Sequence, residues 1–390
     1  MSDAPALPRV RVRARPPRSL PLFASVVLGV FAMLHLVIGW RLLGMPRWPA
    51  ELEAVGIFTL GVLYLSVPAA LASRVLGDRV PSWLSGVGFR WLGLAFYWFV
   101  LSALAEPVVR LGARAWPTLP WAEGGAGVVG VAGLAISAFA LAGARTPPVR
   151  RVEVPVPGLD PGLEGLRIAQ LSDLHVGHTI RRPFVQAVVD RTNAERPDLV
   201  ALTGDFVDGS VADLAHDAAP LGELHAPLGV YFVTGNHEYF TGTVDAWCER
   251  LRHMGIHVLR NERRTVLHDG APLDVLGIDD PFANAPGHGP DLARAIAGRD
   301  RSHASILLAH QPVFGEAAAA AGVSLVLSGH THGGQLWPFH ALVKLVQPYV
   351  AGLVRIGATA LYVSRGTGWW GPPMRLGAPN EITLLTLRRA

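Results

Sequence analysis

Four long apolar runs near the start of the chain constrain its fold more than any other feature. They cover about residues 20–40, 54–73, 91–109 and 124–144. Each has close to 20 residues, and a helix of that length is about 30 Å long, the thickness of a bilayer core. The runs have almost no polar face at helical period, which argues against buried helices of a water-soluble domain. The first is also longer than the apolar core of a signal peptide and lacks a clear cleavage site. We predict four transmembrane helices over residues 20–144.

The distribution of charge predicts how these helices are oriented. Residues 1–150 hold 14 Lys and Arg against 6 Asp and Glu, a balance of +8, whereas residues 151–390 hold 20 against 24, a balance of −4. The arginines gather in the tail 1–19, in the second loop and after the fourth run. Since basic loops stay in the cytoplasm, we expect a multi-pass protein of the cell inner membrane with both termini and its second half in the cytoplasm.

The remaining chain divides into a linker and a globular region. Pro147 and Pro148 end the fourth run, and a Pro/Gly-rich stretch makes residues 145–164 a linker and leading segment. Residues 165–390 follow as one domain, and the tail 1–19 is a basic cytoplasmic segment. Cys248 is the only cysteine, so the chain has neither an intrachain disulfide nor a thiolate metal site.

One pattern recurs along residues 165–390: a short apolar run typical of a strand ends in a polar cluster. The runs cover residues 167–172, 199–203, 229–234, 305–309 and 324–327. The first three clusters are about thirty residues apart, and helix-compatible sequence lies between them at residues 183–196 and 211–224. That spacing is typical of β-α-β units, in which parallel strands bring their carboxyl ends to one edge of a sheet. Ligand sites of α/β sheets form at this edge.

The last polar cluster contains two histidines at spacing two, His330 and His332, held among glycines. Residues i and i+2 of a strand lie on the same side, so both imidazoles can face one point. Such a pair alone is as compatible with a solvated loop as with a metal site. Matching ligands elsewhere in the chain favour the metal site.

Five motifs occur in order along this region: Asp173-x-His175, Gly204-Asp205-x-x-Asp208, Gly235-Asn236-His237-Glu238, His310 and Gly329-His330-x-His332. Together they resemble the calcineurin-like metallophosphoesterase superfamily, and the resemblance covers about residues 165–390. Further stretches resemble a membrane-associated bacterial subgroup, some of whose relatives carry N-terminal spans: Ser172-Asp173-Leu174-His175, Gly333-Gly334-Gln335, Ser364-Arg365-Gly366 and Pro372-Pro373-Met374-Arg375. The resemblance implies an α/β (α+β) metallophosphoesterase domain, a two-sheet β-sandwich flanked by helices, preceded here by the all-α four-helix membrane region.

The resemblance also implies a reaction and a role for each motif residue. Two divalent cations, Mn, Fe or Zn, would be bound by mixed N/O ligands and provide a hydroxide that attacks a phosphoester or pyrophosphate bond. One cation would take Asp173, His175, Asp205 and His332, and the other Asp205, Asn236, His310 and His330, with Asp205 bridging. His237 would protonate the leaving oxygen, and Asp208 would orient His237 or a metal ligand. Arg365 and Arg375 are candidates for binding substrate phosphate, and a surface or packing role fits them equally well.

The expected partners are the bilayer and a phosphoester substrate, of phosphodiester type or linked to a lipid; protein partners are not indicated. The run 342–353 and the aromatic residues around it are unusually apolar for a loop region, so they form either part of the core or a rim that meets acyl chains.

Two functions other than a membrane-anchored phosphoesterase stay open. A nuclease is disfavoured because the second half is net negative, so nucleic acid is not an expected partner. A non-enzymatic sensor or assembly protein is disfavoured because no ligand position is lost.

Overall fold

The computed structural model describes residues 20–240, 242–283 and 288–390; the basic tail predicted for residues 1–19 lies outside them. The described chain forms two compact units. The helical unit comprises residues 20–143 together with Gly371–Met374, and the sandwich unit comprises residues 144–370 and 375–390.

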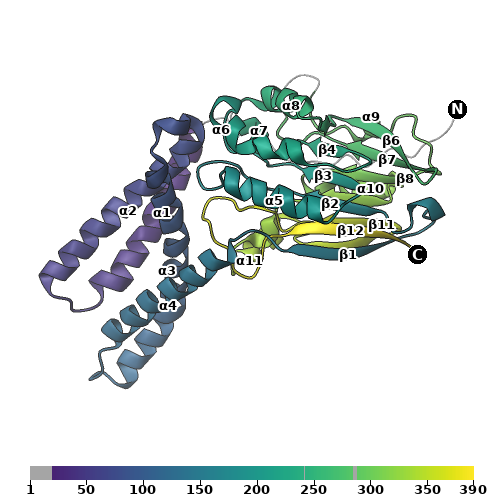
Figure 1. The fold of residues 1–390 in the computed structure, drawn as a ribbon. Coiled ribbons are helices and arrows are strands. Elements are labelled where there is room, and N and C mark those ends of the chain that lie inside the picture. Colours follow the sequence, from purple (N-terminus) through teal and green to yellow (C-terminus); the bar gives the residue numbers. More distant parts are fainter. Residues whose placement is uncertain (1–19, 241, 284–287) are drawn as a thin grey trace. The chain divides into compact units, whose positions relative to one another are not determined.

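The helical unit consists of four main helices, seen in purple to blue in Figure 1: α1 (Leu20–Gly39), continued by the π-helical turn η1 (Trp40–Gly44), α2 (Ala50–Leu76), α3 (Ser82–Ala115) and α4 (Trp121–Gly143). Three of them, α2, α3 and α4, are long and apolar enough to span a membrane. Among the described residues, the segment Leu28–Gly44 is a shorter apolar helix. Of the four helices predicted to span a membrane, three are therefore long and apolar enough to do so, and the spanning itself stays a prediction.

A small buried cluster holds the helical unit together. Ile38 of α1, Val67 of α2 and Trp91 and Ala95 of α3 pack against one another. The indole N–H of Trp91 donates to Nε2 of His35 over 2.8 Å, so the ionisable side chain in α1 has a partner inside the unit. Partnered polar side chains are the usual arrangement between membrane helices.

The sandwich unit is built on two six-stranded sheets. In spatial order, the first contains β1 (Val149–Val156), β12 (Ile382–Arg389), β2 (Arg167–Leu171), β3 (Leu199–Thr203), β4 (Val230–Val233) and β5 (His257–Val258). The second contains β10 (Gly352–Ile356), β11 (Thr359–Val363), β9 (Leu325–Ser328), β8 (Ala304–Leu308), β7 (Ala271–Gly277) and β6 (Glu262–His268). The five predicted strands correspond to β2, β3, β4, β8 and β9, and the predicted linker contains β1.

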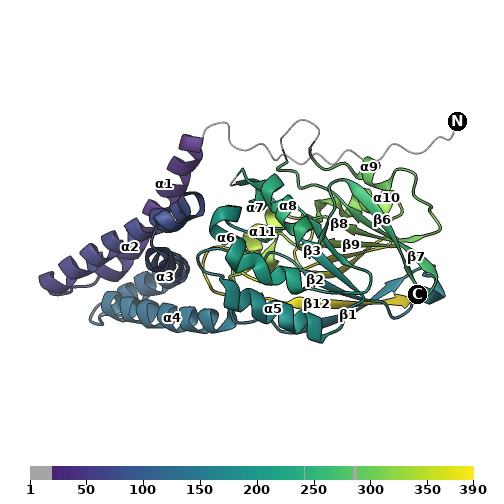
Figure 2. The same cartoon turned by 45° about the horizontal axis from the view of Figure 1, so that its top comes forward.

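Strand direction gathers the loops that carry the motifs. β2, β3, β4 and β5 are parallel neighbours, as are β7, β8, β9 and β11. β12 pairs antiparallel with β2 and parallel with β1, so the end of the chain lies beside the start of the unit (Figures 1 and 2). The carboxyl ends of the central strands therefore lie together at one edge of each sheet.

The core follows the alternation of side chains along each strand. Ile168 and Leu199 of the first sheet pack with Ile306 and Leu325 of the second, which places them between the sheets. The residues next to them in the sequence point to the opposite, outer face of each sheet. In the first sheet these neighbours pack with residues of α5 (Arg182–Ala194), α6 (Val211–Ala218) and α8 (Val244–His253), and in the second with residues of α9 (Leu292–Ile296) and α10 (Gly315–Ala320). The unit is thus a two-sheet sandwich between helices, as predicted.

Two short helices complete the unit. α7 (His237–Phe240) follows β4 directly. α11 (His340–Val346) lies in the run 342–353, which the sequence left open between core and rim. None of the residues of α11 is buried.

Candidate metal centre

The predicted ligands come from five loops, each following a different strand. Asp173 and His175 follow β2, Asp205 follows β3, and Asn236 follows β4. His310 follows β8, and the segment with His330 and His332 follows β9. Apart from His330, which is partly exposed, all of them are buried. Both sheets therefore contribute ligands to one place, where the carboxyl ends of their strands meet.

The backbone of this site adopts a conformation that residues other than glycine rarely adopt. Asp173, His175, Asp205, His330 and His332 all have positive φ angles, between 51° and 70°. This left-handed conformation is unfavourable for most residues and persists where surrounding structure imposes it, which is characteristic of functional sites.

Gly329 permits two of the loops to approach closely. A Cβ atom at this position would overlap Ser172 Oγ and Asp173 Oδ2. Any side chain here would push the loop after β9 away from the loop after β2, and glycine is therefore required for both loops to reach the centre.

Three side chains form the first cluster. Nε2 of His175 lies 3.0 Å from Nε2 of His332, which lies 3.3 Å from Oδ1 of Asp173. Donor atoms about 2.1 Å from one cation are about 3.0–3.4 Å apart at octahedral or tetrahedral angles. The separations in the first cluster fit one cation.

The second cluster has the same spacing. Oδ2 of Asp205 lies 3.1 Å from Nε2 of His310, and Nδ1 of His330 lies 3.3 Å from that nitrogen and 2.9 Å from Oδ1 of Asn236. The same Asp205 oxygen lies 4.0 Å from Nε2 of His175 in the first cluster. Asp205 is therefore the carboxylate that faces both clusters.

The hydrogen bonding around His310 tests whether these side chains suit a cation. Nδ1 of His310 donates to the carbonyl oxygen of Thr203 over 2.8 Å, so in the neutral ring it is Nε2 that has the lone pair, and this atom faces Asp205. Nδ1 of His330 faces that nitrogen and the Asn236 oxygen. Acceptor atoms this close repel one another unless a proton or a cation lies among them. Imidazole, carboxylate and amide donors without sulfur suit Mn, Fe or Zn.

Asp208 links the first cluster to His237. Its Oδ1 accepts from Nδ1 of His175 over 2.9 Å and from Nδ1 of His237 over 2.6 Å. Both imidazoles are thereby held with Nε2 turned away from Asp208, and Nε2 of His237 lies 3.9 Å from Oδ2 of Asp205. A carboxylate behind a metal-binding histidine fixes the tautomer and orientation of the ring.

Electrostatics divides the histidines into two kinds when no cation is bound. Burial disfavours the charge on His310, but Asp205 outweighs it and raises the pKa of that imidazole well above its usual value. Burial would raise the pKa of Asp205, but His310 and its neighbours hold it well below the usual range. Burial, with the charge of His310, lowers the pKa of His330 to about 3. Burial and Arg375 lower the pKa of His332 well below 6.5. His330 and His332 are thus neutral at pH 7, the form that binds metals.

Glu238 has a structural role that its motif position alone did not specify. Its carboxylate accepts from the backbone N–H groups of Asp205, Phe206 and Gly235 over 3.1, 2.7 and 2.7 Å. It thereby ties the loop after β3 to the loop after β4. The sequence signal for it was only its place next to His237.

The two arginines proposed for substrate lie differently. Arg375 is buried, and its guanidinium donates to the carbonyl oxygens of His332 and Arg365 and lies 3.1 Å from Nδ1 of His332. Arg365 is partly exposed and pairs with the buried Glu381 over 2.9 Å. Arg375 therefore contacts a predicted metal ligand, whereas Arg365 faces Glu381, which directly precedes β12.

Known proteins of one family resemble this chain in sequence. Residues 166–334 match the family described as calcineurin-like phosphoesterase. A Danio rerio protein named transmembrane protein with metallophosphoesterase domain is 40% identical over 352 residues, which cover 86% of this chain and 80% of that one. An uncharacterized metallophosphoesterase of Campylobacter jejuni is 37% identical and covers 63% of this chain, which spans only 64% of its length. The relatives thus include animal as well as bacterial proteins.

Among solved structures, a dimetal phosphatase from Danio rerio aligns with a TM-score of 0.35 and 13% identity, covering 54% of this chain and 90% of that one.

Proposed function

Because this chain belongs to the calcineurin-like metallophosphoesterase family of phosphoester hydrolases, we propose that it is a membrane-anchored enzyme that uses two divalent cations to hydrolyse a phosphoester or pyrophosphate bond. The observation that carries the proposal is the position of Asp205, whose carboxylate oxygen faces both ligand clusters. One cation would be held by Asp173, His175, Asp205 and His332. The other would be held by Asp205, Asn236, His310 and His330.

When bound, such a pair of cations makes hydroxide available near neutral pH and neutralises phosphoryl oxygens. The proton that the leaving oxygen takes up would come from a side chain of the protein. His237 is held by Asp208 through Nδ1, and the carboxylate stabilises the cationic imidazolium. Nε2–H of that imidazolium then donates to the phosphoryl group and passes its proton to the leaving oxygen.

The test uses the full chain in detergent. Wild-type protein should contain a divalent metal and turn over a chromogenic phosphodiester, and Asp205→Asn should lose both. His237→Ala should keep its metal while kcat falls at least about 100-fold. His253→Ala, an exposed histidine of α8, is the matched control and should behave like wild type. Wild type without metal-dependent turnover would overturn the proposal, and metal content without turnover on any ester would favour a binding module.

A lipid-linked substrate is the substrate class that the surface favours. Leu342, Leu345 and Val346 of α11 lie on one helical stripe and are 57%, 80% and 76% exposed. Trp337 and Phe339 precede this helix and are also exposed. Exposed apolar residues gathered in this way are typical of lipid or protein contact.

The apolar surface formed by these residues on and before α11 adjoins the loop that carries His332. A Cβ atom on Gly334 would overlap His340, so the first residue of α11 packs on that loop. Gln335 exchanges two hydrogen bonds with the backbone of Trp370, of 2.8 and 2.9 Å, and the Trp370 side chain is exposed. Acyl chains resting on α11 would bring a linked phosphate to the centre.

Kinetics of the full chain test the lipid-linked substrate. Replacing Leu342 and Leu345 by Ser should raise KM for a phosphodiester with a long acyl chain by about tenfold, because apolar contact area is lost. KM for a short soluble phosphodiester should not change. Leu267→Ser, at an exposed leucine of β6, is the control and should affect neither. Equal KM values for the long-chain ester in all three proteins would exclude this use of α11.

We place the enzyme in the inner membrane with the sandwich unit in the cytoplasm, on the strength of the basic loops. A reporter active only in the periplasm, fused after Arg145, should be silent. Strong reporter activity would reverse the orientation.

A further inference from the structure

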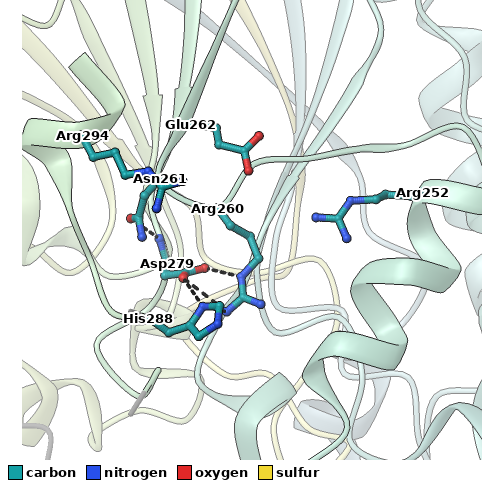
Figure 3. Close-up of a pocket in the computed structure, with 7 residues that line it drawn as sticks. All are labelled: Arg252, Arg260, Asn261, Glu262, Asp279, His288 and Arg294. Atoms are coloured by element: carbon teal, nitrogen blue, oxygen red, sulfur yellow. Dashed lines mark hydrogen bonds and ion pairs between the residues drawn. The ribbon is translucent and has the colours of Figure 1, made fainter. Parts of the chain in front are cut away.

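A polar cavity of about 250 Å³ lies in the sandwich unit and is lined by none of the predicted metal ligands. Three arginines from separate elements converge on it: Arg252 from α8, Arg260 from the segment between β5 and β6, and Arg294 from α9. Figure 3 shows Arg252 and Arg294 on opposite sides of Arg260. The remaining lining residues are Asn261, Glu262, Asp279 and His288.

The floor of this cavity is fixed by an ion pair. Nε of Arg260 donates to Oδ1 of the fully buried Asp279 over 2.8 Å, and Nη2 lies 3.3 Å from Oδ2. Oδ1 of Asn261 accepts from the backbone N–H groups of Asp279 and Asp291 over 3.1 and 2.8 Å. Arg260 is therefore held in place before any ligand arrives.

The rim of the cavity carries positive charge that this network does not use. Among the residues that the structure describes, the guanidinium groups of Arg252 and Arg294 make neither a hydrogen bond nor an ion pair. Arg260 and Asp279 neutralise each other, and the contact of Arg260 with Asp245 is weakened by water because that carboxylate is 81% exposed. Among the remaining lining residues, Arg252 and Arg294 add two positive charges against the one negative charge of Glu262, so the cavity favours an anion.

We propose that this cavity binds a phosphate group other than the one that is hydrolysed. Guanidinium groups present paired N–H donors that match phosphate oxygens, and Arg252 and Arg294 offer two such groups on one cavity.

A hydrogen bond links the cavity to α7, the helix that contains the proposed acid His237. Nη2 of Arg260 donates to the hydroxyl oxygen of Tyr239 over 3.3 Å, and that oxygen lies 3.0 Å from Oγ1 of Thr234. Tyr239 belongs to α7, whose first residue is His237. The bound phosphate is thus either a second phosphate of the substrate or a free phosphate ligand that acts on α7.

Binding is tested on the full chain in detergent after removal of metal by a chelator, so the outcome does not depend on the proposed hydrolysis. Inorganic phosphate is titrated calorimetrically into wild type, Arg252→Ala/Arg294→Ala and the control Arg250→Ala/Arg264→Ala. The control removes two exposed arginines from α8 and β6 that do not line the cavity. We expect affinity at least about tenfold weaker in the cavity variant and unchanged in the control.

A gain of affinity separates the proposal from misfolding. Glu262→Gln removes the carboxylate that opposes phosphate and should tighten binding severalfold. Equal affinity in wild type and the cavity variant, or an equal loss in the control, would overturn the proposal, as would weaker binding in Glu262→Gln.

Two further measurements identify the source of the phosphate, and these rest on the proposed function. If the substrate supplies it, the cavity variant should raise KM for a pyrophosphate diester while KM for a single-phosphate diester stays unchanged. If a free phosphate supplies it, added phosphate should change turnover of the single-phosphate diester in wild type and not in the cavity variant.

Discussion

At the scale of single residues, Asp208 shows how one side chain can serve two others. Its Oδ1 accepts from both His175 and His237, one a predicted metal ligand and the other the proposed acid. A carboxylate in this position couples the orientation of the metal site to the protonation of the acid. Its substitution should therefore affect turnover more than metal content.

We predict that Asp208→Asn lowers kcat by about 10- to 100-fold, because an amide cannot stabilise the imidazolium of His237 and accepts less well from two rings. Bound metal should fall much less, since every predicted ligand remains. Asp213→Asn, at an exposed carboxylate of α6, is the control. Unchanged kcat in Asp208→Asn would contradict this role.

A second residue-scale prediction concerns Asp280, which is buried and accepts from the backbone of Phe282 over 2.9 Å and from Gln311 over 3.0 Å. Burial raises its pKa to about 7, from 3.8. Between these two values the folded protein binds more protons than the unfolded chain, so the contribution of Asp280 to stability is lost as pH rises.

We expect the thermal midpoint of wild type to fall between pH 5 and pH 8 by more than that of Asp280→Asn, which lacks the titration. Asp269→Asn removes a carboxylate whose side chain is 83% exposed and should follow wild type. Parallel pH profiles for wild type and Asp280→Asn would show that the buried carboxyl does not titrate in this range.

At the scale of elements, the centre depends on how closely the strand-end loops approach. Five predicted ligands adopt left-handed backbone, and Gly329 leaves no space for a side chain beside Ser172 and Asp173. The loops are thus held by their packing against one another rather than by their own preferences.

We predict that Gly329→Ala destabilises the sandwich unit by about 1–3 kcal/mol, as overpacking does, and reduces metal content by displacing the loop after β9. Gly222→Ala is the matched control, because an added Cβ there makes only ordinary contact with Met254. Thermal unfolding and metal analysis of both variants measure the effect. Full metal content in Gly329→Ala would mean that the loops have room to adjust.

At the scale of the whole molecule, the two sheets contribute unequal parts of one centre. The first sheet supplies Asp173, His175, Asp205 and Asn236, and the second supplies His310, His330 and His332. A cation bound to both sets joins the two sheets and favours the folded state by mass action.

Removing the metal should therefore lower the thermal stability of the full chain. At a metal concentration 100 times the dissociation constant the contribution is about 2.7 kcal/mol, so a chelator should lower the unfolding midpoint by several degrees. Adding Mn or Zn should restore it, and Asp205→Asn should respond to neither. An unchanged midpoint in wild type would indicate that no metal stabilises the fold.

Much of this protein follows from its sequence. Apolar runs near 20 residues define membrane-compatible helices by length alone, because the bilayer sets that length. The five predicted strands agree with the structure to within about one residue at most ends, since short apolar runs between glycine-rich clusters leave few alternatives. The motif residues Asp173, Asp205 and His330 could be singled out because they follow strands whose carboxyl ends must meet.

Other features were decided only by tertiary structure. The sequence could not show that β12 inserts between β1 and β2, because that pairing joins residues more than 200 positions apart. Nor could it show that Arg375 packs against His332, that α11 leaves its apolar residues exposed, or that Arg252, Arg260 and Arg294 share a cavity. Local pattern determines which segments form helices and strands, and which strand ends carry polar residues. Which of those side chains meet depends on contacts between distant segments, and these exist only once the sheets have packed.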